Sequence, residues 1–280
     1  MNEVIFLWLL AFVYIIFAVI QDLRKREIAD WLNFSLIIFA LGFRFFYSLF
    51  VEEGFVFFYQ GIIGLGIFFV LGNLFYYGKV FAGGDAKLMI ALGAVLPYYP
   101  DFFSNVKILF NFLFIFLSAG FVYISIVSII LCIKNFKSFK KEFFNQLKKN
   151  KKLIFFGLTL CFIFLLFGFA NSMFFIFGIM VLLIFFLYPY SKAIDETCMV
   201  KKIKSKNLRE GDWLYSDIKI GRKMIKAKWD GVTKQEIREI IKRYKEVKIK
   251  EGIPFSPVFI FSFIILIILI LSDKLWNPFW

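Results

Sequence analysis

The sequence contains no histidine, and this absence excludes several kinds of hydrolase. A zinc protease with an HExxH motif, a Ser-His or Cys-His catalytic pair and a histidine-ligated metal all need the missing side chain. The only cysteines are Cys132, Cys161 and Cys198, which form no CxxC pair, so neither a zinc ribbon nor a disulfide framework is indicated. Any hydrolytic chemistry must rest on carboxylates, lysines or hydroxyls, and we expect no metal and no cofactor.

The sequence also has too few polar residues for a soluble protein. It is 61% hydrophobic and contains 43 phenylalanines among 280 residues. Before the first apolar run, MNEVIFLWLL has no Lys or Arg, so we expect a retained first helix and not a cleaved signal peptide. The apolar runs lie at 4–20, 31–50, 55–77, 86–99, 106–133, 153–169, 173–189 and 255–272.

These runs predict an all-α polytopic membrane protein with about eight transmembrane helices and a small cytoplasmic α+β domain. Six or seven spans are also compatible, because the run at 86–99 is short and ends at Pro97. The predicted divisions are a membrane core at 1–133, a basic cytoplasmic loop at 134–152, a transmembrane hairpin at 153–189, the small domain at 190–252, and a last helix with an external C-terminus at 253–280. Within the small domain, Thr233 to Glu236 reads as a helix-capping box.

Positive charge predicts how the spans are oriented. With the N-terminus outside, the inner segments hold 30 of the 34 Lys and Arg residues; these segments are 21–30, 78–85, 134–152 and 190–252. Such a bias places the basic loops on the cytoplasmic side of a multi-pass cell-membrane protein. Anchoring to the lipid bilayer and its anionic lipids accounts for the basic loops, so we expect no nucleic acid as a partner.

Two aspartates lie at the predicted inner membrane boundary. Asp22 follows the first apolar run, and Asp85 precedes the fourth in FAGGDAKLMIALG. Two carboxylates sharing one site cannot both ionise easily, and such a pair can activate water for peptide hydrolysis. Simpler interpretations stay open. Asp22 could be an interfacial residue offset by the basic residues at 24–26, and Asp85 could be a helix N-cap. Gly83 and Gly84 could form a plain turn and not allow a close approach of substrate.

The motifs around both aspartates resemble a known family. Gly83-Gly84-Asp85 within AGGDAKL resembles the GxGD motif of membrane aspartic peptidases, with Ala82 at the first position. Asp22, with Arg26 and Ile28 at +4 and +6, resembles the first-aspartate motif of the type IV prepilin peptidase family. The stretch 252–257 resembles the proline-containing approach to the last span in these proteins. Because paired CxxC motifs are missing, the resemblance is to the archaeal prepilin or preflagellin peptidases.

The resemblance implies roles for individual residues. Asp22 and Asp85 would be catalytic, Gly83 and Gly84 would shape the site, and Lys87 would orient or pair with a carboxylate or only reach the interface. The implied activity is an aspartic-type endopeptidase without methyltransferase activity. Its substrates would be prepilin or preflagellin precursors with class III signal peptides. We further expect local acids, namely Glu27 and Asp30, to meet the basic leader of the substrate.

The sequence is also compatible with two other functional classes, an assembly scaffold and a transporter. A non-catalytic assembly scaffold would need no proximity between the aspartates, whereas a carboxylate-based proton or cation transporter would place them nearer the bilayer midplane. The hairpin at 153–189 could be an extra structural element without a role in the site. It could also be a contact surface for a partner or for a second copy of this chain, in which case the protein would be a homo-oligomer.

Overall fold

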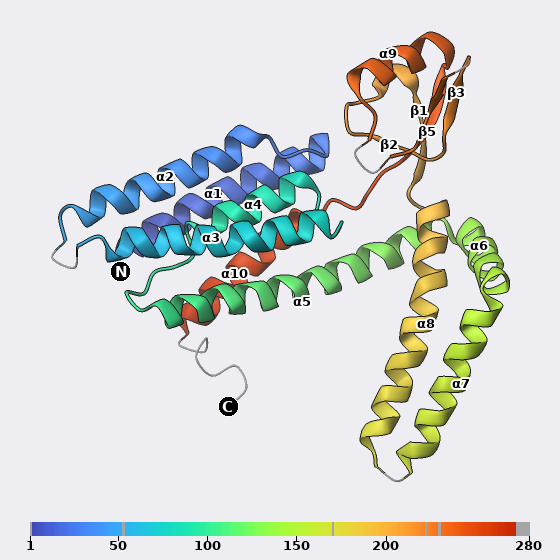
Figure 1. Cartoon of the computed structure of the whole chain (residues 1–280), viewed down its shortest axis with the longest axis horizontal. Helices are drawn as coiled ribbons and strands as arrows, with labels where there is room; N and C mark the ends of the chain where they lie inside the picture. The colour runs from blue at the N-terminus through green and yellow to red at the C-terminus, as the bar shows by residue number, and fades with distance from the viewer. Residues whose placement is uncertain (1, 52–53, 170, 222, 229–230, 273–280) are drawn as a thin grey trace. The chain divides into compact units, whose positions relative to one another are not determined.

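The computed structural model describes residues 2–51, 54–169, 171–221, 223–228 and 231–272 (Figure 1). The chain divides into two compact units, which are described separately. The first unit comprises residues 1–124 and 254–280, and the second comprises residues 125–253. The long helix α5 (Phe102–Lys134) contributes to both units.

The first unit is a helical bundle. Its elements are α1 (Asn2–Lys25), α2 (Asp30–Ser48), α3 (Val56–Tyr77), the short α4 (Gly83–Gly93), the first part of α5, and α10 (Pro257–Leu271). Helix α4 packs against α1, α2 and α3, and α10 packs against α1. The bundle core contains Leu7, Ile15, Leu88, Phe116 and Phe263, all with essentially no exposed surface. The short helix α4 therefore packs against three longer helices, α1, α2 and α3.

Six of the described helices are long and apolar enough to cross a membrane: α1, α2, α3, α5, α7 and α8. This confirms the polytopic helical fold. The fourth and eighth apolar runs form shorter helices, α4 with 11 residues and α10 with 15. At 1.5 Å per residue α4 is about 16 Å long, well below the roughly 30 Å of a hydrocarbon core. The predicted run at 86–99 is thus helical only to Gly93.

Irregular backbone follows α4, and the buried side chain of Arg44 donates hydrogen bonds to its carbonyl groups. Arg44 of α2 is fully buried and donates to the carbonyl oxygens of Ala94 at 2.8 Å and Val95 at 3.0 Å. It also donates to Pro97 and, at 2.8 Å, to Phe57. A cation near a helix C-terminus is favourable, and buried carbonyls without partners are costly. Arg44 therefore fixes the end of the helix that begins beside Asp85.

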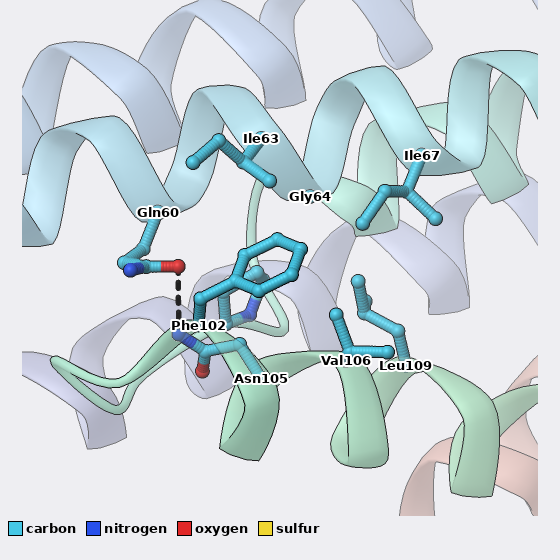
Figure 2. Close-up of a pocket in the computed structure, with 9 residues that line it drawn as sticks. Gln60, Ile63, Gly64, Ile67, Phe102, Asn105, Val106 and Leu109 are labelled. Carbon is cyan, nitrogen blue, oxygen red and sulfur yellow. Dashed lines mark hydrogen bonds between the residues drawn. The ribbon is translucent and has the colours of Figure 1, made fainter.

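A second polar group holds the start of α5 against α3. The Asn105 amide donates to Gln60 Oε1 at 3.0 Å and accepts from the backbone N–H groups of Tyr98 and Tyr99 (Figure 2). The surrounding gap between α3 and α5 leaves no room for a water molecule. The side chains of α3 and α5 are therefore closely packed in this region.

The second unit contains three further helices and a small strand-containing domain. Helices α6 (Phe136–Lys149), α7 (Lys151–Gly168) and α8 (Met173–Thr197) follow α5. The domain comprises β1 (Val200–Lys204), the 3₁₀ turn η1 (Ser205–Asn207), β2 (Trp213–Leu214), β3 (Ile218–Ile220), β4 (Lys223–Ile225), α9 (Lys234–Arg243) and β5 (Glu246–Lys250). Antiparallel pairing gives one sheet of order β1-β5-β2 and a β3-β4 hairpin.

The sequence analysis predicted the helical hairpin and the cap of α9 in this unit, but it did not predict α6. The helical hairpin turns between Gly168 and Met173, and the capping box of Thr233 and Glu236 is present at the start of α9. The stretch 134–152, predicted as a loop, instead contains α6. Its inner face packs on α8, where the Phe139 ring meets the Tyr190 ring edge-on at 5.6 Å. The predicted external C-terminus at residues 273–280 lies outside the described residues.

Candidate functional site

Asp22 lies in the last turn of α1. The helix ends three residues later because Arg26 adopts a left-handed conformation, with φ of 59°, while its N–H still donates to the Asp22 carbonyl at 2.8 Å. The Asp22 carboxylate is partly buried. Its Oδ2 atom faces the backbone N–H of Ser256 at 3.4 Å, so the residue just before α10 meets the end of α1.

Asp85 lies in the first turn of α4 and is 6% exposed. Ala82 is the N-cap of this helix and Asp85 is the third helical residue, so the simple interpretation of Asp85 as the N-cap is wrong. The Asp85 carboxyl group has a hydrogen bond with the backbone of Ala82, and its Oδ1 atom is buried without a partner among the described residues. Helix α1, with Asp22 in its last turn, packs against α4, and Asp22 is near enough to affect the Asp85 carboxyl group electrostatically.

The two glycines before Asp85 have different surroundings. A Cβ atom on Gly84 would lie 3.0 Å from the Cβ and 3.3 Å from the backbone nitrogen of Ile28. A Cβ atom on Gly83 would meet only the Tyr76 ring, at an ordinary 3.7 Å. Neither glycine has a positive φ. Gly84 therefore allows the start of α4 to approach Ile28, in the segment after α1.

The remaining predicted site residues, Lys87, Glu27 and Asp30, have exposed or partly exposed side chains. The Lys87 ammonium of α4 forms an ion pair with Asp30 at the start of α2. The two side chains are 41% and 60% exposed, and Glu27 is exposed as well. The loop between α1 and α2 is fixed by the Ala29 N–H, which donates to Gln21 Oε1 at 2.9 Å. The Asp30 carboxylate is therefore already paired with the Lys87 ammonium of α4.

Two buried polar residues near these elements were not identified from the sequence. Ser256, whose backbone N–H faces Asp22, is fully buried, and its hydroxyl group has no hydrogen-bond partner among the described residues. Asn33, one turn after Asp30 on α2, is 1% exposed, and neither of its amide atoms has a partner in the described structure. The only sequence signal for Ser256 was its place in the proline-flanked stretch 252–257.

Comparison with known proteins supports the resemblance seen in the motifs. Residues 8–133, which include both aspartates, match the type IV leader peptidase family. The chain is 36% identical over 85 residues to a preflagellin peptidase of Methanocaldococcus jannaschii, and 33% identical over 85 residues to one of Methanococcus maripaludis.

Each of these alignments covers 30% of this chain and 36% of the relative, so the chain spans about a third of the curated relatives it matches. No solved structure matches the chain. The predicted resemblance to prepilin and preflagellin peptidases is confirmed, and residues 8–133 are similar to the type IV leader peptidase family.

Proposed function

We propose that this chain is an aspartic-type membrane endopeptidase that removes the leader from prepilin or preflagellin precursors. The observation that carries the proposal is that α1, which ends just after Asp22, packs against α4, which begins just before Asp85, within the segment that matches the leader peptidase family. The buried, unpartnered Oδ1 atom of Asp85 supports it further, because it leaves an acceptor for a water molecule or a substrate group.

The proposed chemistry needs only these two carboxyl groups. Of two close carboxylates, one keeps a proton. The ionised group takes a proton from water as the water oxygen attacks the scissile carbonyl carbon, and the protonated group gives its proton to the carbonyl oxygen. Collapse of the tetrahedral intermediate then breaks the C–N bond: the carboxyl group that took the water proton gives it to the leaving amine, and the other carboxylate takes a hydroxyl proton from the intermediate, which restores the shared proton. No cofactor takes part, and we propose no methyltransferase activity.

The proposed orientation places this reaction at the cytoplasmic membrane face. Arg24, Lys25 and Arg26 follow Asp22, and a positive excess marks the inner side of membrane proteins. A class III leader is basic, so we infer that it meets the exposed Glu27 and competes with Lys87 for Asp30. If so, Glu27→Gln with Asp30→Asn should raise the KM for a precursor with little change in kcat. An unchanged KM would remove both acids from the leader site.

Cleavage of a co-expressed precursor in membranes tests the proposal. Wild type should convert the precursor to the shorter mature form on a gel, whereas Asp22→Asn and Asp85→Asn should each lose at least about a thousand-fold in rate, since each removes one member of an acid–base pair. Asp217→Asn, in the small domain, is the matched control and should cut normally. Wild-type cleavage by either site variant, at normal expression, would refute the mechanism and favour a scaffold or transporter.

A further inference from the structure

Helix α6 carries a group of lysines around an exposed aromatic ring. Lys140 and Lys141 lie four and three residues before Phe144, and Lys148 lies four residues after it, so all three are its surface neighbours on a helix. Lys137 lies two turns before the ring. We call this group the lysine face of α6; its members are Lys137, Lys140, Lys141, Phe144 and Lys148, all of them exposed. Phe144 is 52% exposed.

The lysine face is distinct from the side of α6 that packs on the protein. Phe139 and Phe143 stack on each other with ring centroids 5.7 Å apart, and the Phe139 ring contacts Tyr190 of α8. The only acid on α6, Glu142, accepts a hydrogen bond from the Gln146 amide at 2.7 Å. The packing against α8 thus leaves the lysines and Phe144 facing outward.

The connections at both ends of α6 keep it close to the membrane surface. Only Asn135 separates α6 from α5, and only Asn150 separates it from α7. Both neighbours are long and apolar enough to span a membrane. Helix α7 has 18 residues, about 27 Å, which leaves almost no slack across a hydrocarbon core of roughly 30 Å. The start of α7, and with it the end of α6, must lie at the boundary.

We propose that α6 is an interfacial helix whose lysine face binds the phosphate headgroups of anionic lipids. An aromatic ring is favourable at the headgroup level, while lysines beside it reach the phosphates. Charge complementarity selects this occupant, because a basic peptide leader would be repelled. The proposal does not depend on peptidase activity, so its failure would leave the proposed function untouched.

The proposal can be tested with the purified full chain in a neutral detergent. Phosphatidylglycerol or phosphatidylcholine is titrated in, and the thermal unfolding midpoint reports the apparent lipid affinity. Each lysine near an anionic surface contributes about five-fold in affinity. Replacing the four lysines of the lysine face with glutamine should therefore weaken phosphatidylglycerol binding by roughly a hundred-fold or more and leave phosphatidylcholine binding unchanged. Phe144→Ser should weaken binding of both lipids.

A matched control separates this site from general positive charge. It replaces four exposed lysines of the small domain with glutamine: Lys204, Lys206, Lys242 and Lys245. This control should keep the wild-type affinity for phosphatidylglycerol. Equal loss in both four-lysine variants, or no loss in the α6 variant, would overturn the proposal. Tighter binding of a short RNA duplex than of phosphatidylglycerol to the same lysines would also overturn it, because the surface would then be a nucleic-acid site.

Discussion

Substitution of the two glycines beside Asp85 should have unequal effects, although they are neighbours in one motif. In Gly84→Ala the new Cβ would lie 3.0 Å from the Cβ of Ile28 and 3.3 Å from its backbone nitrogen, so either α4 or the segment after α1 must move by a few tenths of an ångström. In Gly83→Ala the new atom has ordinary space beside Tyr76. Only the first substitution should therefore shift Asp85 relative to Asp22.

The expected magnitudes follow from packing and helix propensity. Alanine is better than glycine in a helix by up to about 1 kcal/mol, which favours both variants. Overpacking typically costs about 1–3 kcal/mol, and this applies to Gly84→Ala alone. Gly84→Ala should therefore unfold roughly 2–8 °C below Gly83→Ala. A displacement near half an ångström should also lower kcat about ten-fold, since about 1 Å can cost a hundred-fold.

Both quantities can be measured on the same preparations. Thermal unfolding in detergent micelles gives the stability difference, and a time course of precursor cleavage gives kcat. Gly83→Ala should stay within about two-fold of the wild-type rate. Equal rates and equal unfolding midpoints for the two alanine variants would refute the claim that Gly84 sets the approach of α4 to Ile28.

Three further predictions concern residues that stabilise the fold, two in the helical bundle and one in the small domain. Arg44→Lys should lower the thermal unfolding midpoint almost as much as Arg44→Met, because a lysine ammonium cannot reproduce the planar guanidinium geometry that donates to four carbonyl groups. A wild-type unfolding midpoint for Arg44→Lys would contradict this. Asn105→Ala should cost about 1–3 kcal/mol, whereas Asn73→Ala, which removes one exposed hydrogen bond, should be nearly neutral in the same melt. Thr233→Ala should destabilise the small domain by about 1 kcal/mol through loss of the capping box, measured by urea unfolding, and an unchanged midpoint would argue against the cap.

Local patterns predicted most helices of the fold, with α6 as an exception. Each of the eight apolar runs contains a helix, the turn at 168–172 divides the long run near 153–189, and Thr233 and Glu236 mark the start of α9. The sequence also predicts that Asp22 and Asp85 approach each other, because one lies at a helix exit and the other at a helix start on the same predicted side of the membrane. The apolar runs, the break between α7 and α8 and the cap of α9 depend only on residues close together in the chain.

Features that depend on distant partners were not predictable in this way. From the sequence, Arg44 was recognisable only as a charged residue inside an apolar run. Its hydrogen bonds could not be predicted, because its carbonyl partners lie 13 to 53 residues away in the chain. Ser256 meets Asp22 across 234 residues. Helix α6 was missed for a different reason: its many lysines suggested a solvated loop, while the apolar positions that pack on Tyr190 have meaning only once α8 is in place.

The proximity of Asp22 and Asp85 is the central claim, and cysteine cross-linking tests it most directly. In a chain whose three native cysteines are replaced by serine, Asp22→Cys with Asp85→Cys should be joined by a short bifunctional thiol reagent in membranes. Asp30→Cys with Lys87→Cys is the matched positive control, because these side chains are in contact. We predict that both pairs cross-link. Cross-linking of the control pair without cross-linking of the aspartate pair would contradict a shared two-carboxylate site.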